Sequence, residues 1–137
     1  MTETHTAFLG LGTNLGDKEA NIARAVELIG RHVGRVVALS SLHATEPVGF
    51  SSPNNFLNAA ARVETTLGPR RLLQATQEIE RAMGRTRKSS AGIHHDRIID
   101  IDILLYDDVS VDEPDLKIPH PGIPYRQFVQ IPLAEIS

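Results

Sequence analysis

Residues 98–106 form the segment that most restricts how this chain can fold. Isoleucine and leucine fill most of its positions, and a short apolar run of this kind predicts a buried strand. Asp100 and Asp102 interrupt the run two residues apart. Side chains alternate between the two faces of a strand, so both carboxylates are expected on one face and the neighbouring isoleucines on the other. The segment therefore predicts a strand with one apolar face and one acidic face.

The paired aspartates predict a metal site. Two like charges on one strand face repel each other, and burying them without a partner costs roughly several kcal/mol. Mg²⁺ suits one or two carboxylates that act together with phosphate oxygens. Residues 85–97 hold an excess of positive charge, which suits an anionic ligand such as a nucleoside triphosphate, although an Asp-x-Asp pair alone also fits a solvated strand end. The cations of this segment are Arg85, Arg87, Lys88 and Arg97.

The length and composition of the chain limit the kinds of protein that it can be. A chain of 137 residues suits one domain, which we expect to span residues 1–137. The net charge of −3 argues against a general nucleic-acid or membrane-surface binder. The absence of cysteine excludes disulfides and thiol catalysis. No signal-peptide pattern or long apolar run is present, so we expect a soluble, cytoplasmic protein. We also expect the protein to be a monomer.

The apolar patterns follow the order strand-helix-strand-strand-helix-strand. This order predicts an α+β fold of the ferredoxin-like split βαβ type, with an antiparallel sheet and its helices on one face. Asp17 is the expected N-cap of the first helix, and Gly68-Pro69 is expected to open the second. Long polar loops in a compact domain are usually functional. The expected strands are 6–12, 36–42, 56–66 and 98–106, the expected helices are 18–32 and 69–83, and the long loops are 46–55 and 84–97.

Two segments suggest a surface for a flat ligand. Residues 10–16 contain Gly-x-Gly-x-x-x-Gly, one residue too long for a dinucleotide-binding loop, so they indicate a tight turn or an exposed backbone surface. Phe56 and Asn58 share one face of an expected strand, and an amide beside an aromatic ring suits a planar heterocycle. An ordinary strand end is the alternative for this pair.

Three further polar residues have ordinary explanations when taken singly. Gln77 and Glu80 lie three positions apart on the expected polar side of the second helix, where a solvated face is the favoured interpretation. His120 lies between two prolines, which fits either a ligand contact or a surface histidine in a rigid turn.

Taken together and in their order along the chain, the motifs of this sequence resemble those of the 6-hydroxymethyl-7,8-dihydropterin pyrophosphokinase family of folate biosynthesis. The family usually has Trp-Gly-Pro before the arginine that corresponds to Arg97, whereas this chain has Ile93-His94-His95-Asp96. The segments that carry the resemblance are 10–16, 45–47 with 49, 56–59, 80, 84–88, 97–104, 119–120 and 126–128.

The resemblance implies transfer of pyrophosphate from ATP to the pterin's hydroxymethyl oxygen, with release of AMP. It implies two Mg²⁺ ions on Asp100 and Asp102, catalytic roles for Arg85 and Arg97, and loops that close over the substrates. Neither nucleic acid nor membrane is an expected partner. The implied nucleotide contacts are Gln77, Glu80, Arg87, Lys88, Ile103, His120 and Arg126. The implied pterin contacts are Thr45, Pro47, Val48, Phe56, Asn58 and Phe128.

Two other classes of function remain alternatives. A non-catalytic nucleotide-binding regulatory module of ferredoxin-like fold has no need for a carboxylate pair. A single-stranded RNA binder of this fold class would carry aromatic residues on its central strands and a basic sheet face. This chain has a net negative charge and only 4% aromatic residues, which disfavours the RNA binder.

Overall fold

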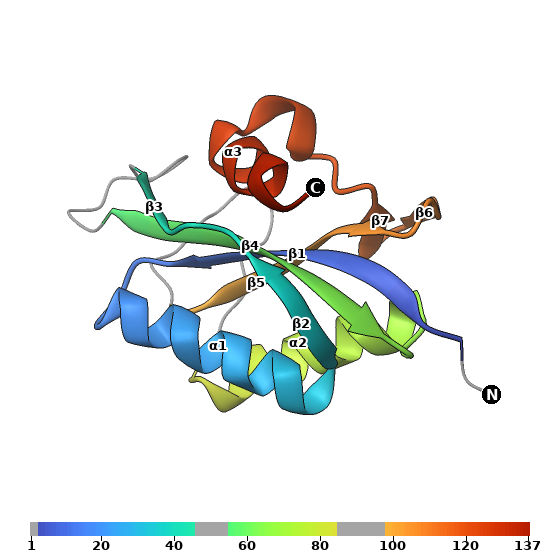
Figure 1. Ribbon diagram of the computed structural model, residues 1–137, viewed down its shortest axis with the longest axis horizontal. Helices are drawn as coiled ribbons and strands as arrows, with labels where there is room; N and C mark the ends of the chain where they lie inside the picture. Colours follow the sequence, from blue (N-terminus) through green and yellow to red (C-terminus); the bar gives the residue numbers. More distant parts are fainter. Residues whose placement is uncertain (1–2, 46–54, 85–97) are drawn as a thin grey trace.

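The computed structural model describes residues 3–45, 55–84 and 98–137, and a five-stranded antiparallel sheet forms its centre (Figure 1). Four strands follow the order β2-β4-β1-β5, and β3 pairs with β4 beside the path of β2. The third expected strand thus lies between the first two, which is the split βαβ arrangement predicted from the sequence. The strands are β1 (His5–Thr13), β2 (Gly34–Leu39), β3 (His43–Thr45), β4 (Phe56–Thr65) and β5 (Asp100–Tyr106).

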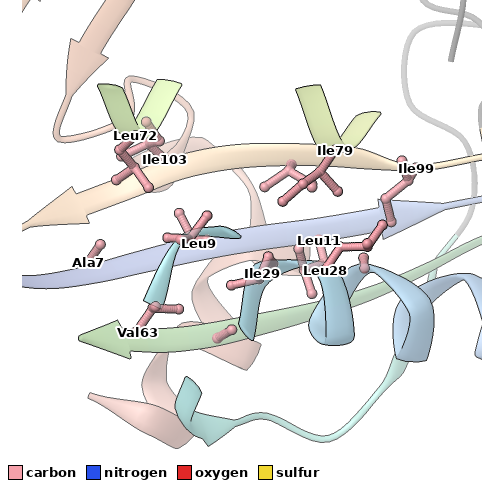
Figure 2. Packing of buried hydrophobic residues seen from close by; sticks show 14 of the residues in the cluster. Ala7, Leu9, Leu11, Leu28, Ile29, Val63, Leu72, Ile79, Ile99 and Ile103 are labelled. Atoms are coloured by element: carbon pink, nitrogen blue, oxygen red, sulfur yellow. The ribbon is translucent and has the colours of Figure 1, made fainter. Parts of the chain in front are cut away.

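Two helices cover one face of the sheet and enclose the hydrophobic core. Helix α1 (Lys18–His32) begins as predicted, because the Asp17 carboxylate accepts a hydrogen bond of 3.1 Å from the backbone N–H of Ala20. Helix α2 (Pro69–Ala82) has a proline in its first turn, where the missing N–H costs no hydrogen bond. Figure 2 shows the core between these helices and the sheet, with residues from both layers interleaved. The core includes Leu9, Leu11, Ile29, Val63, Leu72, Ile79, Ile99, Ile101 and Ile103.

A third helix lies on the opposite face, so the prediction that the helices share one face is wrong. Helix α3 (Gln127–Ile136) follows the 3₁₀ turn η1 (Ile123–Tyr125) and packs mainly on β4 (Figure 1). Its apolar side chains, Leu133 and Ile136, are buried against the sheet. The sequence predicts loop followed by a short terminal helix in this part of the chain, and α3 is that helix, with Pro132 accommodated inside it.

The expected single strand 36–42 is instead two strands. The break follows β2 at Ser40, whose hydroxyl group takes the place of a backbone carbonyl as the acceptor of one hydrogen bond from β4. The Ser40 N–H donates to the Ala60 carbonyl at 2.9 Å, and the Ala60 N–H donates to the Ser40 hydroxyl at 2.8 Å. Gly34 begins β2 rather than closing α1, and a Cβ there would lie 2.0 Å from the Glu64 carbonyl oxygen. The close approach of two backbones therefore requires glycine at this position.

A short hairpin follows the main sheet, close to the strand pair that the sequence suggests around residues 109–111 and 117–118. Its strands are β6 (Val111–Glu113) and β7 (Leu116–Ile118). Within the described ranges, no helix is both long enough and apolar enough to cross a membrane.

Candidate active site

The strand register aligns functional candidates in one row across the sheet. Asp100 of β5 pairs with Gly12 of β1, Gly12 pairs with Asn58 of β4, and Asn58 pairs with His43 of β3. Directly paired residues point to the same face of an antiparallel sheet. The alternate residues of these strands fill the core under α1 and α2, so this row faces α3. The sheet thus places an acidic residue and an amide on one face, with a glycine between them.

The two glycines of β1 keep this face of the sheet open. Gly12 would bring a Cβ to 3.1 Å from Asn58 Oδ1 and to 3.8 Å from a ring carbon of Phe56. Gly10 pairs with Asp102, and its Cβ would lie 3.3 Å from a methyl group of Leu104. Both glycines lie in β1, within the expected strand 6–12, and Gly16 alone of the three has a positive φ, +68°. Glycine at alternate strand positions was the available sequence signal for a close approach.

Asp100 and Asp102 lie on the face predicted for them. Both are half-buried, while Ile99, Ile101 and Ile103 pack in the core on the other side. Two strand positions correspond to about 7 Å, so the carboxylates stand close enough to share a bound cluster of cations and phosphates. Among the described residues, no group of three His, Cys, Asp or Glu side chains gathers into a metal site. A carboxylate pair of this kind suits Mg²⁺, which keeps waters and takes phosphate oxygens as its other ligands.

Glu80 is buried, which corrects its placement on a solvated helix face. Its side chain leaves α2 toward the sheet and is only 4% exposed. The carboxylate accepts a hydrogen bond of 2.8 Å from the backbone N–H of Ile101. Ile101 lies between the two aspartates, so Glu80 fixes the backbone of β5 at the predicted metal site. A role as a positioning residue follows directly from this contact.

His120 is half-buried, and the charges of Arg126 and Asp100 both act on its ring. Burial lowers the pKa of His120, the positive charge of Arg126 lowers it further, and Asp100 raises it. The Gly122 N–H donates to His120 Nδ1 at 2.9 Å, so the neutral ring carries its proton on Nε2. His120 is itself held to the sheet, because its N–H donates to the Leu104 carbonyl at 2.9 Å. A neutral histidine with an Nε2–H donor thus stands beside the predicted metal-binding strand.

Arg126 and Phe128 stand together at the start of α3. The guanidinium carbon of Arg126 lies 5.8 Å from the centre of the Phe128 ring, a cation–π contact. Gly122 leaves the space that Arg126 occupies, since a Cβ at that glycine would lie 3.0 Å from Arg126 Nε. Sequence analysis missed Gly122, whose role depends on a neighbour four residues away.

The remaining predicted residues differ in how they relate to this face. The backbone of Thr45 pairs with that of Phe56, next to the row that contains Asn58. Gln77 is half-buried on α2. The side chain of Ile103 is in the core, so the predicted contact with the nucleotide would involve its backbone. Most of the two long loops, 46–55 and 84–97, lies outside the described residues, and so do the other predicted site residues. These residues are Pro47, Val48, Arg85, Arg87, Lys88 and Arg97.

Residues 8–137 match the family 7,8-dihydro-6-hydroxymethylpterin-pyrophosphokinase (HPPK). The chain belongs to this family. Among its relatives, the 2-amino-4-hydroxy-6-hydroxymethyldihydropteridine pyrophosphokinase of Porphyromonas gingivalis is 46% identical, and the alignment covers 95% of this chain and 89% of the relative. The enzyme of the same name from Bacillus subtilis is 41% identical, with 95% and 77% covered. The resemblance predicted from the sequence is therefore confirmed.

A solved structure of low sequence identity to this chain has the same fold. A Plasmodium falciparum HPPK-DHPS triple mutant with SDX-DHP superimposes with a TM-score of 0.73 at 19% identity. The match covers 96% of this chain and 40% of that longer chain. It shows that the α+β fold predicted from the sequence is the HPPK fold.

Proposed function

We propose that this pyrophosphokinase transfers the terminal pyrophosphoryl group of ATP to the hydroxymethyl oxygen of 6-hydroxymethyl-7,8-dihydropterin and releases AMP. The observation that carries the residue assignment is the row Asp100–Gly12–Asn58 on the α3 face of the sheet. In this row the Asp100 carboxylate and the Asn58 amide lie two strands apart, which is about 10 Å. Both substrates would therefore meet over β1, where glycine leaves room for them.

The pterin would lie at the β4 end of the row. Asn58 is buried, and an amide side chain carries both donor and acceptor groups, which suits the polar edge of the ring system. Phe56 lies on the same sheet face as Asn58, and Phe128 would approach from α3, which packs over β4. An aromatic ring on each side of a flat heterocycle supplies stacking without fixing its identity, while the amide reads its edge. The backbone of Thr45, paired with that of Phe56, borders this pocket.

The triphosphate would lie at the β5 end. Asp100 and Asp102 would hold two Mg²⁺ ions, which neutralise phosphate charge and orient the transferred group when bound. His120 would donate its Nε2–H to a phosphate oxygen, and Arg126 would contribute a permanent positive charge. Further cations would come from Arg85, Arg87, Lys88 and Arg97. Glu80 would act through the β5 backbone and not through the nucleotide.

Transfer of this kind needs little covalent help from the protein. The pterin hydroxyl attacks the β-phosphorus as the bond to the α-phosphate oxygen breaks, so the pyrophosphoryl group moves and AMP leaves. Catalysis then depends on alignment of the two substrates and on stabilisation of negative charge. A rigid sheet supplies the alignment, since the row fixes Asp100 and Asn58 relative to each other. The ions and the cationic side chains supply the stabilisation.

The decisive experiment follows the products of purified protein with ATP, Mg²⁺ and the hydroxymethyl pterin. AMP together with pyrophosphorylated pterin is the expected result, whereas ADP would contradict the reaction. Binding of ATP without turnover would favour the regulatory-module alternative.

The metal assignment is tested by Asp102→Ala. We expect turnover to fall by at least about 10²-fold, comparable to the loss of one electrostatic stabiliser of the transition state. Asp108→Ala is the matched control, because Asp108 is an exposed acid in the turn that follows the same strand. Turnover near that of the unmodified protein in Asp102→Ala at saturating Mg²⁺ would refute the assignment.

A further inference from the structure

A polar contact joins the end of α3 to the edge of the sheet far from the aspartates. Glu135 lies in the last turn of α3, and its Oε1 accepts a hydrogen bond of 2.8 Å from the backbone N–H of Ser41. Its Oε2 accepts a hydrogen bond from Nε2 of His43. The two side chains are about one-third exposed, at 31% for His43 and 33% for Glu135. One carboxylate therefore binds two points of the chain that are 92 and 94 residues away.

The contact involves an ionised carboxylate. The Ser41 N–H and the His43 ring hold the pKa of Glu135 below its usual range. Hydrogen bonds to an ionised acceptor are stronger than those between neutral groups. Because the two donors lie on either side of residue 42, the carboxylate also fixes the chain that enters β3.

β3 needs such support. It is three residues long and pairs with β4 through His43–Asn58, Ala44–Leu57 and Thr45–Phe56. His43 is thus the direct cross-strand neighbour of Asn58, and it ends the row that begins at Asp100. A strand this short gains little stability from its own ladder, so a bond from α3 contributes much of its anchoring.

The same bond also ties the C-terminal end of α3 to the edge of the sheet. The N-terminal end of α3 carries Phe128, and its C-terminal end carries Glu135. A second contact at that end, from the Arg62 guanidinium to the Ile136 carbonyl at 3.4 Å, is longer and joins α3 to a different part of β4. Phe128 belongs to the same helix, which packs on the strand that carries Phe56 and Asn58, so we expect its position to respond to where Glu135 holds the helix.

We infer that His43 and Glu135 form a clasp that positions the two walls of the pterin pocket, β3–β4 on one side and α3 on the other. This inference rests on the proposed function, since it concerns the pocket assigned to the pterin. The clasp contacts no substrate; it sets the spacing between the groups that do. Neither residue belongs to the predicted site, because nothing in the local sequence relates position 43 to position 135.

The test compares Glu135→Ala, Glu135→Gln, His43→Ala and the double variant Glu135→Ala/His43→Ala. Calorimetric titrations measure the Kd of the hydroxymethyl pterin and, separately, the Kd of a non-hydrolysable ATP analogue with Mg²⁺. Asp112→Ala is the matched control, because it removes the Lys117–Asp112 bond of 2.5 Å in the β6–β7 hairpin. Thermal melting checks that each variant remains folded.

We expect Glu135→Ala to raise the pterin Kd about 5- to 10-fold, the range for loss of a partly exposed charge-assisted hydrogen bond. His43→Ala should raise it less, and the double variant should resemble Glu135→Ala, because both changes break one contact. The Kd of the ATP analogue should stay within about twofold, as in Asp112→Ala. If Glu135→Ala does not fold, Glu135→Gln decides, since its amide keeps one acceptor and loses the charge.

Equal losses for both ligands, or a pterin Kd unchanged from that of Asp112→Ala, would overturn the clasp. These outcomes differ from failure of the proposed function, in which the unmodified protein binds no pterin or forms no AMP. A selective loss of pterin affinity is also an effect that a purely structural role would not produce.

Discussion

Gly12 is the position at which a single methyl group tests the arrangement of the site. Gly12 lies between Asp100 and Asn58 in the row across the sheet. In Gly12→Ala the new Cβ would lie 3.1 Å from Asn58 Oδ1, which is closer than ordinary van der Waals contact. Its φ does not lie in the positive range, so alanine fits the backbone without strain. The substitution therefore acts on the neighbouring amide and not on the strand.

The size of the effect follows from that distance. The Asn58 amide has to move by a few tenths of an ångström to admit the methyl group. Such a shift misaligns one hydrogen bond to the pterin edge, whose net value is about 0.5–1.5 kcal/mol. At 1.4 kcal/mol for each factor of ten, the Kd for the pterin rises roughly 2- to 12-fold. Stability should change little, because alanine also restricts the unfolded chain by about 0.4–1 kcal/mol.

The assay measures pterin and ATP-analogue affinities separately, together with the thermal midpoint. Gly30→Ala is the control, since Gly30 lies exposed in α1 and a Cβ there meets no atom within 4 Å. A selective rise in the Kd for the pterin is expected in Gly12→Ala alone. The reasoning fails if the pterin Kd matches that of Gly30→Ala, or if both ligands lose affinity equally.

Two further substitutions probe the groups around β5 and α3. Gly122→Ala places a Cβ 3.0 Å from Arg126 Nε and displaces the guanidinium, so the KM for ATP should rise about 3- to 10-fold in steady-state assays, the value of one charge-assisted contact; an unchanged KM would show that Arg126 does not reach the nucleotide. Glu80→Ala leaves the Ile101 N–H without its acceptor, so urea titration should show the free energy of unfolding reduced by about 1–3 kcal/mol. Glu80→Gln keeps an acceptor oxygen and should lose less, and equal losses in the two variants would contradict the hydrogen-bond explanation.

The fold was predictable where one local pattern determines an element. Helix α1 begins after Asp17 as expected, because the cap and the apolar period agree. The expected strand order also holds, since alternating and apolar runs were distinct. Helix α3 was underestimated, because Pro132 interrupts its pattern and tertiary packing on the sheet compensates for the lost hydrogen bond. The break after β2 depends on the Ser40 hydroxyl bonding to Ala60, a contact that no local pattern contains.

The candidate site was predictable by side-chain alternation but not by register. Alternation placed Asp100 with Asp102 and Phe56 with Asn58, each pair on one face. Which of these residues lie opposite each other depends on strand pairing across more than 40 residues of sequence. Glu80 was misjudged for a related reason, because its polarity suggested solvent and only the position of α2 brings it to the Ile101 N–H.

One face of the sheet packs in the core and the other carries the polar residues. This difference explains why the residues predicted separately from β1, β4 and β5 lie together in one site. In β1, β4 and β5 one set of alternate residues is apolar and fills the core under α1 and α2, and that set fixes the register. A slip of one residue would bring Asp100 and Asn58 into the core, at a cost of several kcal/mol per buried polar group, by order of magnitude. The packing of one face therefore determines which polar residues align on the other. The packing of the core is in this way the physical cause of the alignment of Asp100, Gly12 and Asn58. β1 tolerates glycine at positions 10 and 12 because Leu9 and Leu11, on its opposite face, stabilise the strand through the core.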